Sequence, residues 1–370
     1  MMKMKRIRIS RRLVRTRVVP AGLLVIAAAG GLACRPGRGN APGPVAPGAS
    51  VTLVADEPEA ALAILAARAT GSTVSDTLWD ALWSSVGYRR LAHRELAMGR
   101  AFSDSQFRRF LESDTLAARR EALERTLVSW KRADIGSAAQ RAAAYLPRGT
   151  GLRAQLLPLV KPQTNSFVFD TGTDSAAIFL YLDPSVTREQ LEVTLAHELH
   201  HIGFATACAG AEDSALTSQQ RTAVTWLGAF GEGIAVLAAA GGPDVHPHAA
   251  SDSAERARWD RDYERIATDL PRVEAFFLDI LAGRLTEPEA VRRRAMSFYG
   301  DAQGPWYTIG YAMAATIERV DGRESLRAAL CDGRELLRRY NSAAARANAS
   351  ATGSTRVPLW SEALLAGLGR

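Results

Sequence analysis

Apolar residues recur every three or four positions through much of the chain, which is the spacing that places them on one face of a helix. Three early stretches have this pattern, namely Ala60 to Arg68, Ser75 to Arg100 and Phe107 to Arg132. Their leucines and aromatic residues are expected to pack into the core, and we assign them no chemistry. The spacing therefore predicts a mostly helical chain from Val51 onward.

The pattern changes after Gly149, where glycines and prolines interrupt any helix. Three segments rich in aliphatic and aromatic residues have the composition of β-strands. They are Ala154 to Val160, Ser166 to Phe169 and Ala176 to Leu182. Because proline cannot donate a hydrogen bond within a sheet, Pro158 is expected at an edge or a bulge. The predicted fold class is α+β, predominantly α-helical, with a small β-sheet.

A longer helix is predicted to begin after this sheet. Thr187 and Gln190 have the spacing of a capping box, in which each side chain accepts a hydrogen bond from the other residue's backbone at a helix start. Four apolar residues then share one face, which is expected to pack into the core. They are Leu191, Leu195, Leu199 and Ile202. A second apolar helix follows and is expected to end at Gly242-Pro243-Asp244.

The formal net charge of +7 comes from the beginning of the chain. Positions 3 to 17 hold eight lysines and arginines and no acid. Without these eight, 38 basic residues remain against 39 acidic ones, a net charge of −1. A nearly neutral remainder does not provide an extended basic surface, so no nucleic-acid partner is expected.

The eight cations precede an apolar run from Val18 to Ala33, and Cys34 follows it. A basic segment and then an apolar one are typical of an export signal, which we assign to residues 1–33. Gly31 to Cys34 resembles a bacterial lipobox, apart from the glycine at its first position. Lipidation of Cys34, cleavage nearby and an N-terminal anchor helix are the alternatives.

Residues 34–50 are rich in proline and glycine and predict a flexible tether. A leader, a cysteine and a tether in this order indicate an exported protein, periplasmic or at the cell surface. Membrane contact is expected only through the leader or through a lipid on Cys34.

Cys208 and Cys331 are the remaining cysteines of the chain. Outside the cytoplasm they could form one disulfide. The alternative is a pair of small, buried thiols.

His197 and His201 lie four residues apart on the predicted helix, so their imidazoles point the same way. Two such imidazoles suit zinc, and Glu198 lies beside the same cleft, where a carboxylate can take a proton from a zinc-activated water. This arrangement is the H-E-x-x-H pattern of zinc hydrolases. The alternative is a solvated polar face. His200 is interpreted as a residue that supports the ligands or lies at the surface.

A catalytic zinc site needs a third protein ligand, and we expect Glu232. An acid within an apolar helix is costly unless it is paired or binds a metal. Gly231 and Gly233 have no side chains, so this helix is expected to approach the histidine helix closely. The alternative ligands are Glu212, Asp213 and His246. The loop histidines His246 and His248 are expected to be exposed.

With these residues in place, the sequence resembles the gluzincin metallopeptidases, which combine H-E-x-x-H with a glutamate on a later helix. It is most similar to an uncharacterised bacterial family of zinc-dependent peptidases, in which three elements recur in order. Here they are His197 to His201, Glu232 to Ala235 and Trp306 to Tyr311. The gap of 31 residues between His201 and Glu232 is longer than in thermolysin-like gluzincins.

The segment from Pro305 to Gly310 also looks like an element of leukotriene hydrolase and related aminopeptidases. In that group a tyrosine steadies the oxyanion, and the resemblance implies this role for Tyr307. Tyr311, one helical turn further on, is the alternative. A packing helix without a catalytic tyrosine is the other interpretation.

The resemblance implies a zincin-like catalytic region at residues 149–340, after a helical lobe at 51–148 and before a C-terminal tail at 341–370. It implies one catalytic Zn²⁺ and hydrolysis of a peptide or protein substrate, with Glu198 as the general base. The edge strand expected within Ala176 to Leu182 could align an extended peptide. The alternatives are a surface module that binds metal or peptide without turnover, and a zinc hydrolase of a non-peptide bond.

Overall fold

The computed structural model describes residues 50–209, 215–300, 303–350 and 356–369. The predicted export signal, Cys34 and residues 34–49 of the predicted tether lie outside these ranges. Two of the alternative metal ligands, Glu212 and Asp213, also lie outside them. Helices dominate the described residues and one small sheet accompanies them, so the predicted α+β, predominantly helical class is confirmed.

The sheet has four strands in the order β1-β2-β4-β3. They are β1 (Ser50–Leu53), β2 (Arg153–Leu159), β3 (Phe167–Phe169) and β4 (Ala177–Tyr181). Neighbouring strands are parallel except for β3, which is antiparallel to β4. The three predicted strands are therefore confirmed, whereas β1 was not predicted. Its four residues are too few to show a period, and a strand this short forms only because β2 supplies its hydrogen-bond partner.

The order of the strands corrects one expectation. The strand predicted within Ala176 to Leu182 is β4, which lies between β2 and β3 and has no open edge. The prediction that this strand lies at an edge of the sheet, where it could align a substrate peptide, is therefore wrong. The expectation for Pro158 holds locally, because pairing between β1 and β2 ends at Leu156 and leaves β2 without a neighbour on that side.

Seven helices come between β1 and β2. They are α1 (Asp56–Ala69), α2 (Asp76–Ser84), α3 (Val86–Ala97), α4 (Asp104–Leu111), α5 (Asp114–Ala117), α6 (Arg120–Trp130) and α7 (Ile135–Ala143). Two predicted long helices are divided by serines. Ser85 ends α2 and caps α3, while Ser113 caps α5, and each side chain accepts a backbone hydrogen bond from the new helix.

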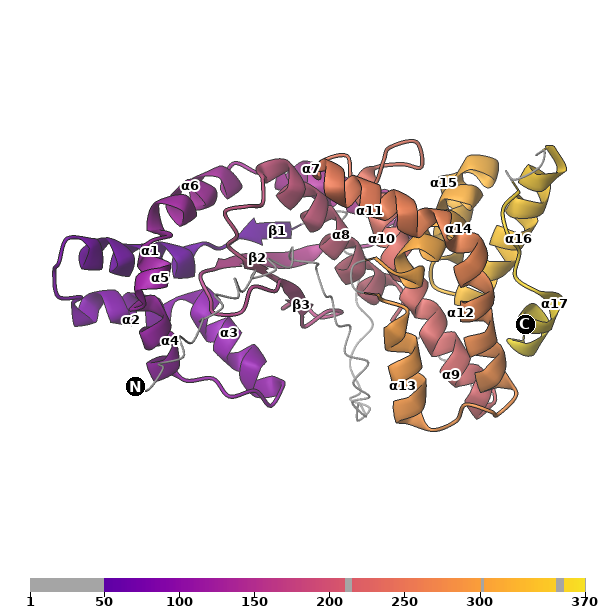
Figure 1. Ribbon diagram of the computed structural model, residues 1–370, viewed down its shortest axis with the longest axis horizontal. Helices are drawn as coiled ribbons and strands as arrows, with labels where there is room; N and C mark the ends of the chain where they lie inside the picture. Colours follow the sequence, from indigo (N-terminus) through magenta and orange to yellow (C-terminus); the bar gives the residue numbers. More distant parts are fainter. Residues whose placement is uncertain (1–49, 210–214, 301–302, 351–355, 370) are drawn as a thin grey trace, which may run out of the picture.

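The remaining helices follow the sheet. They are α8 (Arg188–Ala207), α9 (Ser218–Leu227), the short 3-10 helix η1 (Gly228–Phe230), α10 (Gly231–Ala240), α11 (Ser253–Glu264), α12 (Ile266–Leu281), α13 (Pro288–Ser297), α14 (Pro305–Asp321), α15 (Arg323–Ala329), α16 (Gly333–Ser350) and α17 (Glu362–Gly367). Helix α16 runs through residue 341, where the C-terminal tail was predicted to begin. Figure 1 shows two groups of helices at the ends of the long axis, with the sheet and α8 between them.

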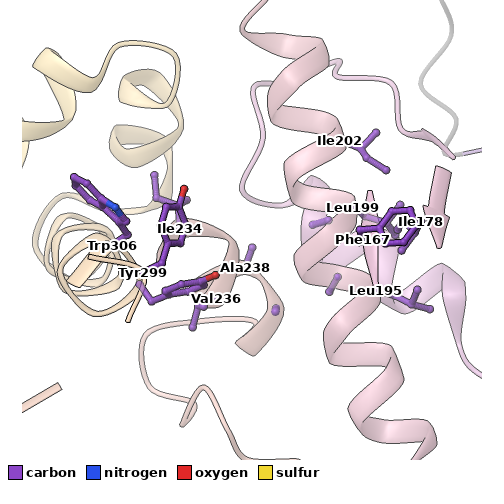
Figure 2. Packing of buried hydrophobic residues seen from close by; sticks show 14 of the residues in the cluster. Phe167, Ile178, Leu195, Leu199, Ile202, Ile234, Val236, Ala238, Tyr299 and Trp306 are labelled. Atoms are coloured by element: carbon purple, nitrogen blue, oxygen red, sulfur yellow. The ribbon is translucent and has the colours of Figure 1, made fainter. Parts of the chain in front are cut away.

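Helix α8 is anchored along one face. Its capping box is present as predicted, with both hydrogen bonds between Thr187 and Gln190 formed. Leu195, Leu199 and Ile202 are buried in the core on the side where residues of the sheet lie (Figure 2). Burying each such side chain contributes about 1.5–3 kcal/mol. The leucine face thus fixes the orientation of the helix, and residues on its other side can bind a ligand.

A disulfide joins Cys208, at the C-terminal end of α8, to Cys331, between α15 and α16. The two cysteines are separated by 123 positions in the sequence. Their bond ties the last turn of α8 to the C-terminal helices. The disulfide interpretation of these cysteines is therefore confirmed, and the interpretation as two free thiols is wrong.

Among the described residues, one continuous helical stretch is long and apolar enough to cross a membrane by length and composition. It is Ser218–Ala240, which comprises α9, η1 and α10. Its most apolar window is 67% buried inside the protein, and α10 packs against α8 and α14. This stretch is therefore a core helix of the fold.

Candidate metal centre

Three side chains from two helices meet at one point. His197 and His201 project from the middle of α8, and their Nε2 atoms are 3.0 Å apart. The Oε2 atom of Glu232, in the first turn of α10, lies 3.3 Å from the His197 Nε2 and 3.1 Å from the His201 Nε2. The structure thus brings together the three predicted ligands, although they come from positions 31 residues apart.

The spacing of these atoms fits a zinc ion. Zinc bonds to histidine nitrogen and carboxylate oxygen are about 2.0–2.2 Å long, so two tetrahedral ligand atoms are separated by about 3.3 Å. The observed separations of 3.0–3.3 Å are within a few tenths of an ångström of that value. Two imidazole nitrogens and one carboxylate oxygen are also the donor types that zinc prefers in catalytic sites. His197, His201 and Glu232 therefore fit a zinc ion.

The pKa values of Glu232 and His201 also fit a site for a cation. Burial alone would raise the pKa of Glu232, which is 3% exposed, but His201 and His197 outweigh it and hold that pKa at about 2. Burial would lower the pKa of His201, but the Glu232 carboxylate raises it to about 9. Without a metal, Glu232 and His201 thus form a buried ion pair. A divalent cation bound at the same atoms replaces that proton.

The two glycines beside Glu232 have a different role from the one predicted. A Cβ added to Gly233 would lie 2.0 Å from the backbone nitrogen of Tyr311 and 2.4 Å from the carbonyl carbon of Gly310, both in α14. A Cβ added to Gly231 would meet nothing within 4 Å. The contact that requires Gly233 is therefore with α14, although α10 also packs against the histidine helix α8 as expected. Gly310 makes the same contact from the other side, against the carbonyl oxygen of Phe230.

Glu198 is buried against the metal centre. Its side chain is 0% exposed, and among the described residues neither carboxylate oxygen has a hydrogen-bond partner. Burial raises its pKa, while His197 and His201 oppose this rise. A buried carboxylate without partners is costly in a purely structural role. A water molecule and a cation beside Glu198 would offset the cost of burying its carboxylate.

His200 does not lie at the surface, so that part of its interpretation is wrong. The residue is 0% exposed, and among the described residues neither ring nitrogen has a hydrogen-bond partner. Burial, and then the charges of His201 and His197, lower its pKa to about 3, so the ring is neutral. Its ring centroid is 6.4 Å from that of His201, so it lies beside this ligand.

The two candidate tyrosines project from α14 one helical turn apart and have different neighbours. Burial, and then the carboxylate of Glu232, raise the pKa of Tyr307 far above its usual range, so its hydroxyl stays protonated. Tyr307 also lines the cavity that His197 enters. Tyr311 instead lies between Trp259 and Tyr263, and its hydroxyl donates to the carbonyl of Pro243. Of the two, Tyr307 is the one whose hydroxyl is near the metal centre.

A cavity of about 450 Å³ adjoins the centre. Its walls come from α8, α10, α11 and the loop between α10 and α11, and both His197 and Tyr307 line it. His248 lines it as well, with its Nε2 atom 2.6 Å from the Gln303 Oε1, and is half-buried where an exposed position was predicted. His246 is also half-buried, and its Nε2 lies 3.0 Å from Asp260, outside the metal centre.

Residues of this cavity could be found only in part from the sequence. The acids of α11 recur at helical spacing, which predicts a shared face but not what that face contacts. The position of His248 depends on how the loop after α10 folds back, and no local pattern reports it.

Comparison with known proteins gives one match. Residues 88–349 match a protein family described as "Putative zinc dependent peptidase (DUF5700)". The chain belongs to this family. No curated protein and no solved structure matches the chain. The matched residues include the whole metal centre, Glu198 and Tyr307, so the resemblance to a family of zinc-dependent peptidases is confirmed.

Proposed function

We propose that this member of the zinc-dependent peptidase family is a gluzincin-type hydrolase that cleaves peptide bonds. The observation that carries the proposal is the meeting of His197, His201 and Glu232 within 3.0–3.3 Å, beside the buried and unpartnered Glu198. A site that only stores or transports metal has no need of such a carboxylate. These three ligands would hold one Zn²⁺.

Bound there, zinc would acidify a water molecule and polarise the carbonyl of the scissile bond. Glu198 acts as the general base that takes the proton from this water, and it then carries the proton to the leaving amine. Burial raises the pKa of Glu198, which favours the protonated carboxyl that forms once it has taken the proton from water.

Tyr307 supplies a hydroxyl donor near Glu232, in the lining of the same cavity as His197. Because the hydroxyl remains protonated, it can donate a hydrogen bond to the oxyanion that develops as the carbonyl carbon becomes tetrahedral. It projects from α14, which is held against α10 by the Gly233 and Gly310 contact. The tyrosine and the glutamate ligand are therefore positioned by one rigid pair of helices.

We also propose that the protein works outside the cytoplasm. The disulfide between Cys208 and Cys331 supports this location, because such bonds persist in oxidising compartments. The basic and apolar N-terminal segment supports it independently.

The direct test is Glu198→Gln, assayed on a broad peptide library with zinc content measured in parallel. The variant should retain stoichiometric zinc and lose hydrolysis by a factor of about 10² to 10⁴. Glu189→Gln, an exposed acid on the same helix, is the matched control and should cleave like wild type. Unchanged activity in Glu198→Gln would show that another group is the base.

The third ligand is tested separately by Glu232→Ala. This variant should lose most of its zinc by elemental analysis, because only two of the three donor atoms remain. Stoichiometric zinc in Glu232→Ala would transfer the ligand role to another acid.

A further inference from the structure

The cavity beside the metal centre has walls of two kinds. Its apolar part is formed by valines and alanines of α8 and α10, including Val193, Val236 and Ala239, and by the buried ring of Trp259. His197 and Tyr307 lie at one part of its lining. The cavity is therefore next to the position at which a scissile bond would reach the metal centre.

The charged part of the lining is acidic. Four carboxylates and one guanidinium line the cavity, namely Asp183, Asp252, Glu255 and Asp262 against Arg258. Burial lowers the pKa of His248, so this histidine adds no positive charge near neutral pH. The lining therefore carries a net negative charge, whereas the chain without the eight basic residues of positions 3 to 17 has a formal net charge of only −1.

Two of these carboxylates already accept hydrogen bonds within the fold. Asp183 accepts hydrogen bonds from Ser185, and Asp252 caps the N-terminus of α11 by accepting from the backbone of Glu255. Among the described residues the other two form no such hydrogen bond, although the charges of nearby arginines, Arg265 first, oppose the effect of burial on the pKa of Asp262. Within the described part of the chain, neither Glu255 nor Asp262 forms an ion pair within 4 Å.

Glu255 and Asp262 are seven residues apart, which is two turns of α11, so they project from one face. Both are half-buried, and burial raises the pKa of Asp262. Arg258 lies between them on the same face and forms no ion pair with either. Glu255, which has no ion pair among the described residues, is the stronger of the two sites for a cation, and a partly buried carboxylate at the end of an apolar surface is complementary to a cation on a hydrocarbon chain.

We propose that this cavity binds a lysine or arginine side chain of the substrate, next to the bond that is cleaved. The hydrocarbon stem packs on Val236 and Trp259, and the charged end meets Glu255 and Asp262. This inference rests on the proposed peptidase function and adds the class of substrate to it. The same reasoning excludes acidic residues from the subsite, because they would face the unpaired carboxylates.

The first experiment measures turnover with internally quenched peptides. In each peptide one position near the cleaved bond, on either side of it in turn, is occupied by lysine, arginine, norleucine or glutamate. Norleucine matches the hydrocarbon stem of lysine without its charge. At the position that occupies the cavity, lysine should be cleaved with a kcat/KM at least about 5-fold above norleucine, and glutamate least well. Glu255→Gln should reduce the ratio of lysine to norleucine by about 5-fold. Glu264→Gln, an exposed acid at the end of the same helix, should leave the ratio unchanged.

The second experiment measures binding without turnover, in zinc-loaded Glu198→Gln. The lysine peptide should bind at least about 5-fold more tightly than the norleucine peptide, and adding Glu255→Gln should remove the difference. Turnover without any preference for a cation would overturn this inference and leave the peptidase function intact. Preferential binding with no turnover in wild type would support the inference and overturn the peptidase function. Equal binding of both peptides would overturn the inference directly.

Discussion

Replacement of Gly233 by alanine perturbs the contact on which the geometry of the centre depends. The added Cβ would lie 2.0 Å from the Tyr311 nitrogen and 2.4 Å from the Tyr307 carbonyl oxygen. Ordinary contacts of this kind begin near 3.4 Å. All the neighbouring atoms belong to backbone, so no side chain can rotate away. Helices α10 and α14 must therefore separate by roughly 1 Å or more.

This separation has two measurable consequences. Overpacking of a core contact costs about 1–3 kcal/mol, so the free energy of unfolding should fall by at least that amount in urea denaturation. Because Glu232 precedes Gly233 and Tyr307 lies across the contact, the two should also move apart. We expect weaker zinc binding and a fall in kcat of at least about 10-fold, since misplacement by about 1 Å can cost 10²-fold.

Gly231→Ala is the matched control, because it makes the same change two residues earlier, where no atom lies within 4 Å. It should keep wild-type stability, zinc affinity and activity. Gly310→Ala should behave like Gly233→Ala, since its Cβ would lie 2.4 Å from the carbonyl oxygen of Phe230. Wild-type stability and zinc affinity in Gly233→Ala would refute the view that this helix contact positions the centre.

Three further predictions concern separate parts of the molecule. Tyr307→Phe should lower kcat by about 10² to 10³ with zinc content unchanged, as expected for loss of one oxyanion donor, whereas Tyr311→Phe should change kcat little. Replacing Cys208 and Cys331 by serine should lower the free energy of unfolding by about 2–5 kcal/mol, measured in urea, because a long closed loop is released; an unchanged midpoint would contradict this. Burial raises the pKa of Glu57 to about 8, so the folded state holds its proton and wild-type stability should fall between pH 4.5 and pH 8. Glu57→Gln cannot lose that proton and should gain on the order of 4 kcal/mol relative to wild type over this interval, whereas parallel curves for the two proteins would exclude the buried acid as the cause.

The histidine helix could be predicted in nearly every respect. A capping box, a leucine stripe and two histidines four residues apart are all local patterns, and one helix satisfies them together. Glu232 could be predicted for an energetic reason, since an acid among apolar residues requires a partner. Its partner was also predictable, because the chain contains few histidines.

The features that were missed depend on contacts between distant segments. Strand β1 is formed by pairing with residues about a hundred positions later, and its own sequence does not specify it. The role of Gly233 was assigned to the wrong neighbour, because a glycine signals a close approach without naming the other side. His200 was interpreted partly as a surface residue from its angle on the helix, and only the packing of other elements around α8 shows that it is buried.

The proposed function depends above all on a zinc ion held by His197, His201 and Glu232. The measurement that tests this most directly is anomalous diffraction at the zinc absorption edge, from crystals of zinc-loaded protein. We predict a single strong peak at about 2.0–2.2 Å from the two Nε2 atoms and from a carboxylate oxygen of Glu232. A peak coordinated by other residues, or none after zinc loading, would contradict the central claim.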